Sequence, residues 1–267
     1  MSVGRAFSAL PTMLRVGVAE TVAYRAEFLV WILTTTIPLV MLGLWNAVAA
    51  SGAFRGYSQG DFTAYFLAVL IVRNVAGSWV GWQIGEEIRM GTMSMRLLRP
   101  IHPFVALAAS HAAAIPFRCV VAIPIAVILL VSSGGSSLTT EPLQLAMLVP
   151  SLVFAWLITF AIMFAIGSLS FWITKAMGLF SLYFLLFSLL SGYLMPIAIL
   201  PHPIAVVAEW LPFRFMIAVP VELMTLELSS DEVVLLIAVQ LAWVVLSIGL
   251  AMFVWNRGVK RFESVGA

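Results

Sequence analysis

The run VVLLIAVQLAWVVLSIGLAMFVW, residues 233–255, contains no charged side chain. It is long enough to cross the hydrocarbon core of a bilayer as one α-helix, which takes about 20 residues. The whole chain has 267 residues, of which 63% are hydrophobic and only 10% charged, with a mean hydropathy of +1.09. Because soluble domains usually carry about 25% charged residues, the sequence predicts an all-α integral membrane protein.

Five other runs of similar length are also apolar, so the sequence predicts six transmembrane helices. Two of the six runs are interrupted by an arginine, Arg73 in one and Arg118 in the other. The predicted spans are residues 28–50, 62–85, 112–131, 145–172, 177–199 and 233–255.

The basic residues fix the predicted orientation, because loops rich in lysine and arginine stay on the cytoplasmic side. With six spans and both termini inside, ten of the 14 basic residues fall on the cytoplasmic side and two outside. The sequence therefore predicts a multi-pass protein of a bacterial inner membrane or plasma membrane, in contact with membrane lipid. No basic stripe with interleaved aromatic residues is present, so nucleic acid is not an expected partner.

Two segments outside the spans carry further predictions. Residues 1–27 place apolar and charged positions at helical spacing, which predicts an interfacial amphipathic helix, with a loosely ordered tail as the alternative. Residues 200–232 are apolar but cut by prolines into short pieces, which predicts re-entrant helices on the outer face. Their candidate gate residues are Glu209, Pro212 and Glu222. A cap that only seals the outer face is the alternative.

Signatures of catalysis are missing from the sequence. It contains no G-x-x-x-x-G-K-[ST] phosphate loop, no G-x-S-x-G elbow and no H-E-x-x-H motif. His102, His111 and His202 lack the spacing of metal ligands. We therefore expect no enzymatic activity, no bound cofactor and no metal site on this chain, and a membrane-embedded enzyme is disfavoured.

A stripe of small residues follows the intramembrane arginine of the second predicted span. The residues spaced four apart are Arg73, Gly77, Gly81 and Gly85. Small residues at this spacing let another helix approach closely. An arginine near the bilayer midplane needs a partner, for which Glu209 and Glu222 are the candidates, whereas the alternative is snorkelling or pairing with backbone carbonyls. Arg118 lies near the cytoplasmic end of its span, where snorkelling suffices.

Between the second and third spans, the stretch WQIGEEIRMGTMSMRLLRP, residues 82–100, places charges between two apolar runs. Its alternation predicts a short amphipathic helix over residues 86–100 on the cytoplasmic face, with a solvated loop as the alternative. Acidic residues do little to orient a membrane protein, and the apolar positions need a partner surface. The positions of interest are Glu86, Glu87, Arg89, Met93 and Leu97.

Together these features resemble the six-span permeases of ABC-2-type transporters. The first cytoplasmic loop of that family reads acid-x-x-x-G-T-x-x-x-x-L-L-x-P, which matches Glu87, Gly91, Thr92, Leu97, Leu98 and Pro100. The family pattern S-G-x-x-x-P-x-x-x-x-P followed by L-P matches Ser191, Gly192, Pro196, Pro201, Leu211 and Pro212. One departure is Ser94, where many relatives carry an acid.

The resemblance implies that residues 1–267 form a single permease domain that works as a homodimer or heterodimer and docks separate ABC ATPase subunits. Those subunits would bind ATP and Mg²⁺. Residues 86–100 would be the coupling helix that contacts the ATPase, and the re-entrant helices would gate an export path. Secondary transport and a non-transporting scaffold role are the alternatives. The spans contain no carboxylate to carry a proton, which disfavours secondary transport.

Overall fold

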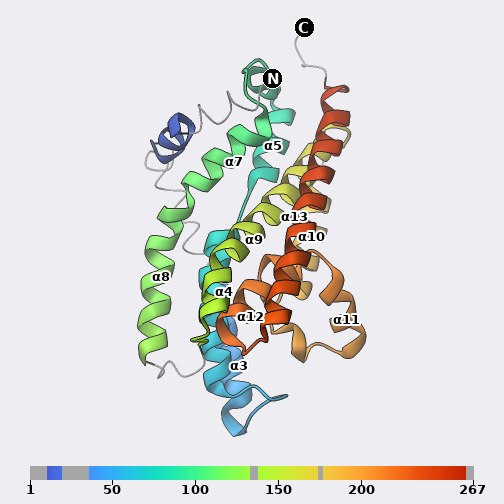
Figure 1. The fold of residues 1–267 in the computed structure, drawn as a ribbon. Helices are drawn as coiled ribbons and strands as arrows, with labels where there is room; N and C mark the ends of the chain where they lie inside the picture. Colours follow the sequence, from blue (N-terminus) through green and yellow to red (C-terminus); the bar gives the residue numbers. More distant parts are fainter. Residues whose placement is uncertain (1–10, 20–35, 133–137, 174–176, 263–267) are drawn as a thin grey trace.

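A computed structural model of the chain describes residues 11–19, 36–132, 138–173 and 177–262 (Figure 1). These residues form helices and connecting segments, and their only strand-like pairing is an isolated bridge between Phe54 and Tyr57. The α-helices are α3 (Ile37–Val48), α4 (Gln59–Ala76), α5 (Val80–Arg89), α6 (Met93–Leu97), α7 (Pro103–Ala113), α8 (Ile115–Ser132), α9 (Pro142–Ser168), α10 (Met177–Leu190), α11 (His202–Trp210), α12 (Ala218–Thr225) and α13 (Ser230–Val259). Short 3-10 turns are η1 (Ala49–Ser51), η2 (Leu169–Phe171), η3 (Ile197–Ile199) and η4 (Arg214–Met216).

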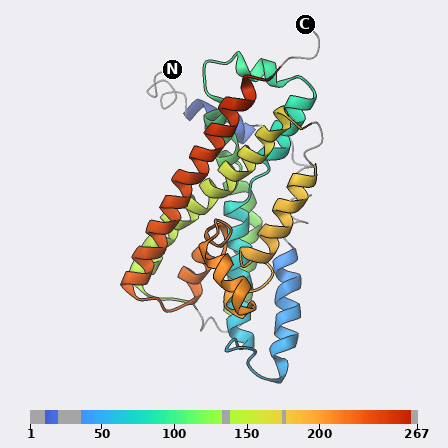
Figure 2. The same cartoon turned by 90° about the vertical axis from the view of Figure 1, so that its right-hand side faces the viewer.

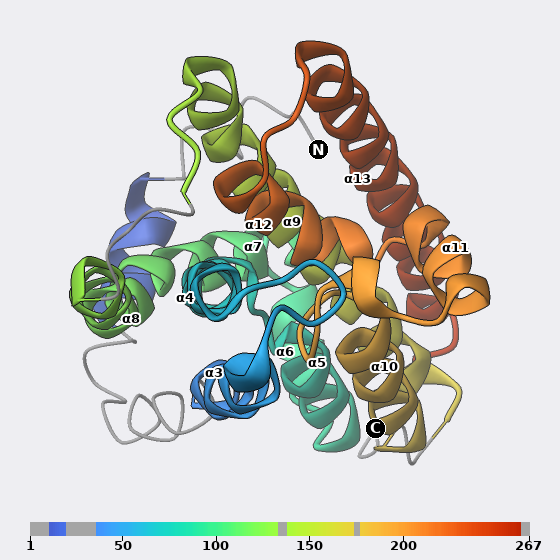
Figure 3. The same cartoon turned by 90° about the horizontal axis from the view of Figure 1, so that it is seen from below.

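Helix α4 lies at the centre of the bundle. It begins with a capping box in which the Ser58 hydroxyl accepts from the Asp61 backbone and the Asp61 carboxylate accepts from the Ser58 backbone. Helices α3, α8, α9 and α12 pack around it, as the view along its axis shows (Figure 3). Phe62 and Phe66 are fully buried within this packing. Eleven of the 18 residues of α4 are buried, so the other helices are packed around this one.

Helices α9 and α13 pack along each other beside this centre (Figure 2). Their contact includes Phe164 of α9 and Trp255 of α13, whose ring centroids are 5.0 Å apart. The outward faces of the bundle remain apolar, with Val127 of α8, Leu185 of α10 and Val245 of α13 all exposed. Exposure of such apolar faces to water is unfavourable, so they are suited to contact with lipid or another apolar surface.

Four helical stretches of the described chain are long and apolar enough to cross a membrane, and two shorter helices are apolar. The predicted all-α membrane class is therefore confirmed, whereas the number of six spans stays a prediction. Part of the first predicted span lies outside the described residues. The four long stretches are Gln59–Arg89, Pro103–Val120, Pro142–Phe171 and Ser230–Val259, and the shorter ones are Ile37–Ser51 and Met177–Leu190.

The second predicted span, residues 62–85, is not one continuous helix. Helix α4 ends at Ala76 and α5 begins at Val80. Gly77 takes an extended conformation with ψ of 140°, so the backbone leaves the helix for three residues. The prediction of a single helix with one unbroken glycine stripe was therefore wrong, because hydropathy does not register a local break in backbone direction.

The predicted fifth span, residues 177–199, also ends early, at Leu190. Gly192 follows with φ of +85°, a left-handed backbone conformation that residues other than glycine rarely adopt. A Cβ there would lie 2.5 Å from the Tyr65 hydroxyl oxygen. Backbone strain and crowding therefore both require glycine at this turn, and the chain goes on into η3 and the short helices α11 and α12.

The remaining predicted segments are short helices. In the segment of residues 200–232, α12 packs between α4 and α9, while α11 lies further out with most of its residues exposed. Residues 11–19 are helical, and Gly17 lies against Ala113 of α7. The rest of the predicted interfacial helix over residues 1–27 lies outside the described residues.

Candidate functional site

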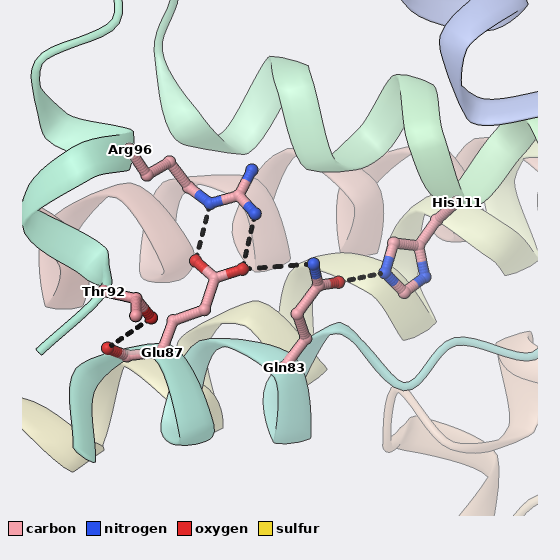
Figure 4. A network of polar contacts seen from close by, with 5 residues as sticks. All are labelled: Gln83, Glu87, Thr92, Arg96 and His111. Atoms are coloured by element: carbon pink, nitrogen blue, oxygen red, sulfur yellow. Dashed lines mark hydrogen bonds and ion pairs between the residues drawn. The ribbon is translucent and has the colours of Figure 1, made fainter. Parts of the chain in front are cut away.

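The segment between α5 and α7 is held by a bidentate ion pair between Glu87 of α5 and Arg96 of α6 (Figure 4). Arg96 Nε donates to Glu87 Oε2 at 2.6 Å, and Arg96 Nη2 donates to the other carboxylate oxygen. Both side chains are only 18% exposed. A forked guanidinium–carboxylate contact fixes orientation as well as distance, so it sets the angle of α6 relative to α5.

Glu86 and Arg89 pair with each other on the exposed side of α5. An exposed pair of this kind contributes about 0.5 kcal/mol or less to stability. The two acids of this segment, which look equivalent in the sequence, therefore have different environments. Glu87 holds the segment together, whereas Glu86 presents charge to the surroundings.

The apolar residues of α6 do not face the way their spacing predicts. Met93 is fully buried in the core and Leu97 packs against that core. Met93 therefore presents no surface to a partner in this arrangement, and its predicted coupling role stays a prediction. Met95 and Leu98 face outward instead, with 68% and 81% of their surface exposed, and Met90 is also exposed.

A chain of hydrogen bonds continues inward from the Glu87–Arg96 pair (Figure 4). Gln83 Nε2 donates to Glu87 Oε1 at 3.2 Å, and the side-chain amide oxygen of Gln83, Oε1, lies 3.1 Å from His111 Nε2. Nε2 of His111 therefore donates, which leaves Nδ1 as an acceptor for the Ser78 hydroxyl at 3.4 Å. This chain connects α6, α5 and α7 to the break between α4 and α5.

Arg118 of α8 also reaches the break. Its Nη1 donates to the carbonyl oxygen of Gly77 at 2.6 Å, which satisfies an acceptor that the interrupted helix leaves without a helical partner. The guanidinium carbon lies 5.4 Å from the centre of the Trp79 ring. Only 6% of Arg118 is exposed, so the prediction that this residue snorkels to the surface was wrong.

Arg73 has no ion pair with either candidate acid. Its guanidinium carbon lies 5.4 Å from the ring centre of Phe187 and 5.9 Å from that of Tyr193. Glu222 instead pairs with Arg214, whose Nη2 donates to it at 2.8 Å. Glu209 lies on the exposed side of α11. The predicted acidic partner of Arg73 is thus replaced by the faces of aromatic rings.

The glycines of the second predicted span have separate surroundings. A Cβ at Gly81 would lie 2.6 Å from the Met163 carbonyl oxygen, and a Cβ at Gly167 of α9 would lie 2.6 Å from the Gly81 carbonyl oxygen. Helices α5 and α9 therefore approach each other through two glycines. Gly85 is less tightly packed, because a Cβ there would lie 3.2 Å from Ser170 Oγ.

The segment that follows α10 is fastened to the bundle through its backbone. Tyr65 Oη donates to the Gly192 carbonyl oxygen at 2.7 Å, and Arg55 Nη1 donates to that of Ile199 at 2.8 Å. Gln240 of α13 donates to the Phe215 carbonyl oxygen at 2.9 Å. Pro212 lies two residues before η4, and its carbonyl oxygen accepts from the Phe215 backbone. These anchors hold the predicted gate region in one arrangement.

Within the described residues, no group of three or more His, Cys, Asp or Glu side chains could hold a metal ion. The model of a family described as "ABC-2 family transporter protein" matches residues 29–266 of the chain. Comparison with curated proteins gives no match.

Proposed function

The chain belongs to the ABC-2 transporter family, and from this membership we propose that it is the membrane-spanning permease subunit of an ATP-driven exporter. Two copies, or this chain and a second permease, would form the substrate path with six spans each. Both termini would lie in the cytoplasm. ATP and Mg²⁺ would bind to separate ABC ATPase subunits.

The observation that carries the proposal is the outward face of α6. Met95 and Leu98 are exposed on a segment that the Glu87–Arg96 pair holds in a fixed orientation. Apolar side chains that project from a rigid support and lie beside exposed charges resemble the anchors at the centre of protein interfaces. We assign this surface, composed of Met95, Leu98, Glu86 and Arg89, as the docking surface for the ATPase.

The hydrogen-bond chain supplies a route for coupling. Movement of α6 by the ATPase would displace Arg96 and Glu87, then Gln83 and His111, which contacts Ser78 at the break. A three-residue break in a buried helix is a place where two helical segments can change their angle without breaking many backbone hydrogen bonds. The proposed permease would therefore bend at Gly77 when the ATPase closes.

The subunit assignment is tested with the full chain purified together with its bound proteins. We expect a phosphate-loop ATPase in the complex and two permease chains for each pair of ATPases by mass photometry. Arg96→Glu should reduce ATP-dependent export into vesicles, and the combined exchange Arg96→Glu with Glu87→Arg should restore part of it. Purification without any ATPase, in mild detergent and in nanodiscs, would contradict the proposal.

The orientation is tested by cysteine labelling in a background without Cys119. A cysteine at Ser230 should react with an impermeant thiol reagent added to intact cells, whereas one at Arg99 should react only after lysis. Both positions are exposed in the fold, so accessibility does not bias the comparison. Labelling of the Arg99 position in intact cells would refute cytoplasmic termini.

A further inference from the structure

We propose that Arg55 is a latch that holds the outer end of the predicted gate region closed, and that this contact opens during the transport cycle. Opening rests on the proposed permease function, whereas the contact itself does not. Arg55 lies in the loop that joins α3 to α4, and this loop reaches toward the segment before α11 (Figure 3). In the proposed orientation, both lie on the outer face.

Prolines leave several carbonyl oxygens of residues 191–201 without a donor at helical spacing. Pro196 is the fourth residue after Gly192, and Pro203 is the fourth after Ile199 and the third after Leu200. Proline has no backbone N–H, so none of these three carbonyl oxygens can accept a helical hydrogen bond from the proline in question. The segment therefore needs donors from elsewhere in the fold.

The donors come from α4 and from the loop between α3 and α4. Tyr65 Oη donates to the Gly192 carbonyl oxygen at 2.7 Å. Arg55 Nη1 donates to the carbonyl oxygen of Ile199 at 2.8 Å and to that of Leu200 at 3.4 Å. Backbone carbonyl oxygens that lose their partner when buried are costly, so these contacts decide where the segment lies.

The two ends of the segment are held differently. At Gly192, φ of +85° and the hydrogen bond from the buried Tyr65 fix the turn within the core. At the other end the donor is Arg55, an exposed residue. Ile199 and Leu200 are only 5% and 7% exposed, so movement of this end would uncover apolar surface, and the closed position is the resting one. The arrangement is a hinge at Gly192 and a releasable contact at Arg55.

The backbone of Arg55 is strained, which its side-chain contact offsets. Phe54 and Tyr57 pair through two backbone hydrogen bonds of 2.9 and 3.0 Å, and Arg55 and Gly56 between them have φ of +48° and +87°. Positive φ at both central positions is typical of a type I′ hairpin turn, which favours asparagine, aspartate or glycine there. Such outliers persist where the surrounding structure fixes them and are concentrated at functional sites. The turn thus presents the Arg55 side chain to the gate region at a backbone cost.

The first test measures hydrogen exchange of residues 193–201 in the full chain, in nanodiscs of phosphatidylcholine. Arg55→Asn removes the guanidinium but keeps a residue that tolerates positive φ. We expect exchange in this segment to become about tenfold faster, the effect of losing one charge-assisted hydrogen bond. The thermal midpoint should not fall, because the turn loses its strain.

Gly56→Asn is the matched control, because a Cβ at Gly56 would meet nothing within 4 Å and Arg55 stays in place. We expect exchange at the wild-type rate in this control. Wild-type exchange in Arg55→Asn would overturn the latch, and so would equally fast exchange in both variants. A fall in the thermal midpoint of Arg55→Asn would show that the residue only supports the fold, which also overturns it.

A second test asks whether the contact opens during transport. The permease is purified together with its ATPase, and exchange is compared before and after addition of ATP, Mg²⁺ and vanadate. We expect residues 193–201 of the trapped wild-type complex to exchange about as fast as those of the resting Arg55→Asn variant. Unchanged exchange on trapping, in a complex that hydrolyses ATP, would overturn the gating role. The first test needs no ATPase, so failure of the latch is separate from failure of the permease assignment.

Discussion

Replacing Leu98 by aspartate is the sharpest test of the docking surface on α6. The side chain is 81% exposed, so nearly all of its apolar surface is available for burial by a partner. Complete burial of a leucine side chain contributes about 2 kcal/mol, and loss of that amount weakens binding about 30-fold. Aspartate adds the cost of placing a charge in an apolar contact, so 30-fold is the lower end of the expected effect.

The assay is a titration of the purified ATPase against the permease in nanodiscs, with Kd as the readout. Met177→Asp is the matched control, because Met177 is a similarly exposed apolar residue at the start of α10, on the same face of the membrane in the proposed orientation. We expect wild-type affinity for the Met177 variant and a Kd at least about 30-fold higher for the Leu98 variant. Equal Kd values for Leu98→Asp and wild type would refute the assignment of α6 as the docking element.

Three further outcomes are expected. Arg96→Gln leaves the largely buried Glu87 carboxylate without its partner and should lower the free energy of unfolding by about 2 kcal/mol. The double variant Glu87→Gln with Arg96→Gln should lower it by less. A double-mutant cycle in chemical denaturation measures the difference. Gly81→Ala should destabilise the fold by about 1–3 kcal/mol through contact with α9, while Gly178→Ala, which meets nothing within 4 Å, should change the thermal midpoint little. Burial lowers the pKa of His102, whose neutral Nδ1 accepts from the Phe104 backbone and so caps α7. The first turn of α7 should therefore be protected from hydrogen exchange above about pH 6.5, and this protection should be lost as the pH falls. His102→Asn should remove this pH dependence.

Several features of the molecule follow from the sequence because they depend on composition summed over many residues. The runs of about 20 apolar residues determine a helical membrane protein, since backbone groups in lipid must be satisfied within a helix. The missing phosphate loop excludes a nucleotide site of that kind, and the order of short motifs resembles the family that residues 29–266 match. The position of the amphipathic segment between α5 and α7 is also readable, because its charges interrupt two apolar runs.

The orientation of individual side chains was decided by tertiary packing. Helix α6 has five residues, fewer than two turns, so its sequence does not define which face is buried. Contact with the core buries Met93 and leaves Met95 and Leu98 exposed, an arrangement that the spacing of the apolar residues does not predict.

The same limit applies to the intramembrane arginines. Hydropathy shows that each is costly, but the partner depends on which helix lies next to it. The break at Gly77 exposes a carbonyl oxygen to Arg118, and the turn after α10 brings Tyr193 over Arg73, while Glu222 is taken by Arg214. The sequence by itself determined that these charges needed partners, because desolvation is a property of each side chain. Only the tertiary structure decided which partners they have, because that depends on distances between segments far apart in the chain.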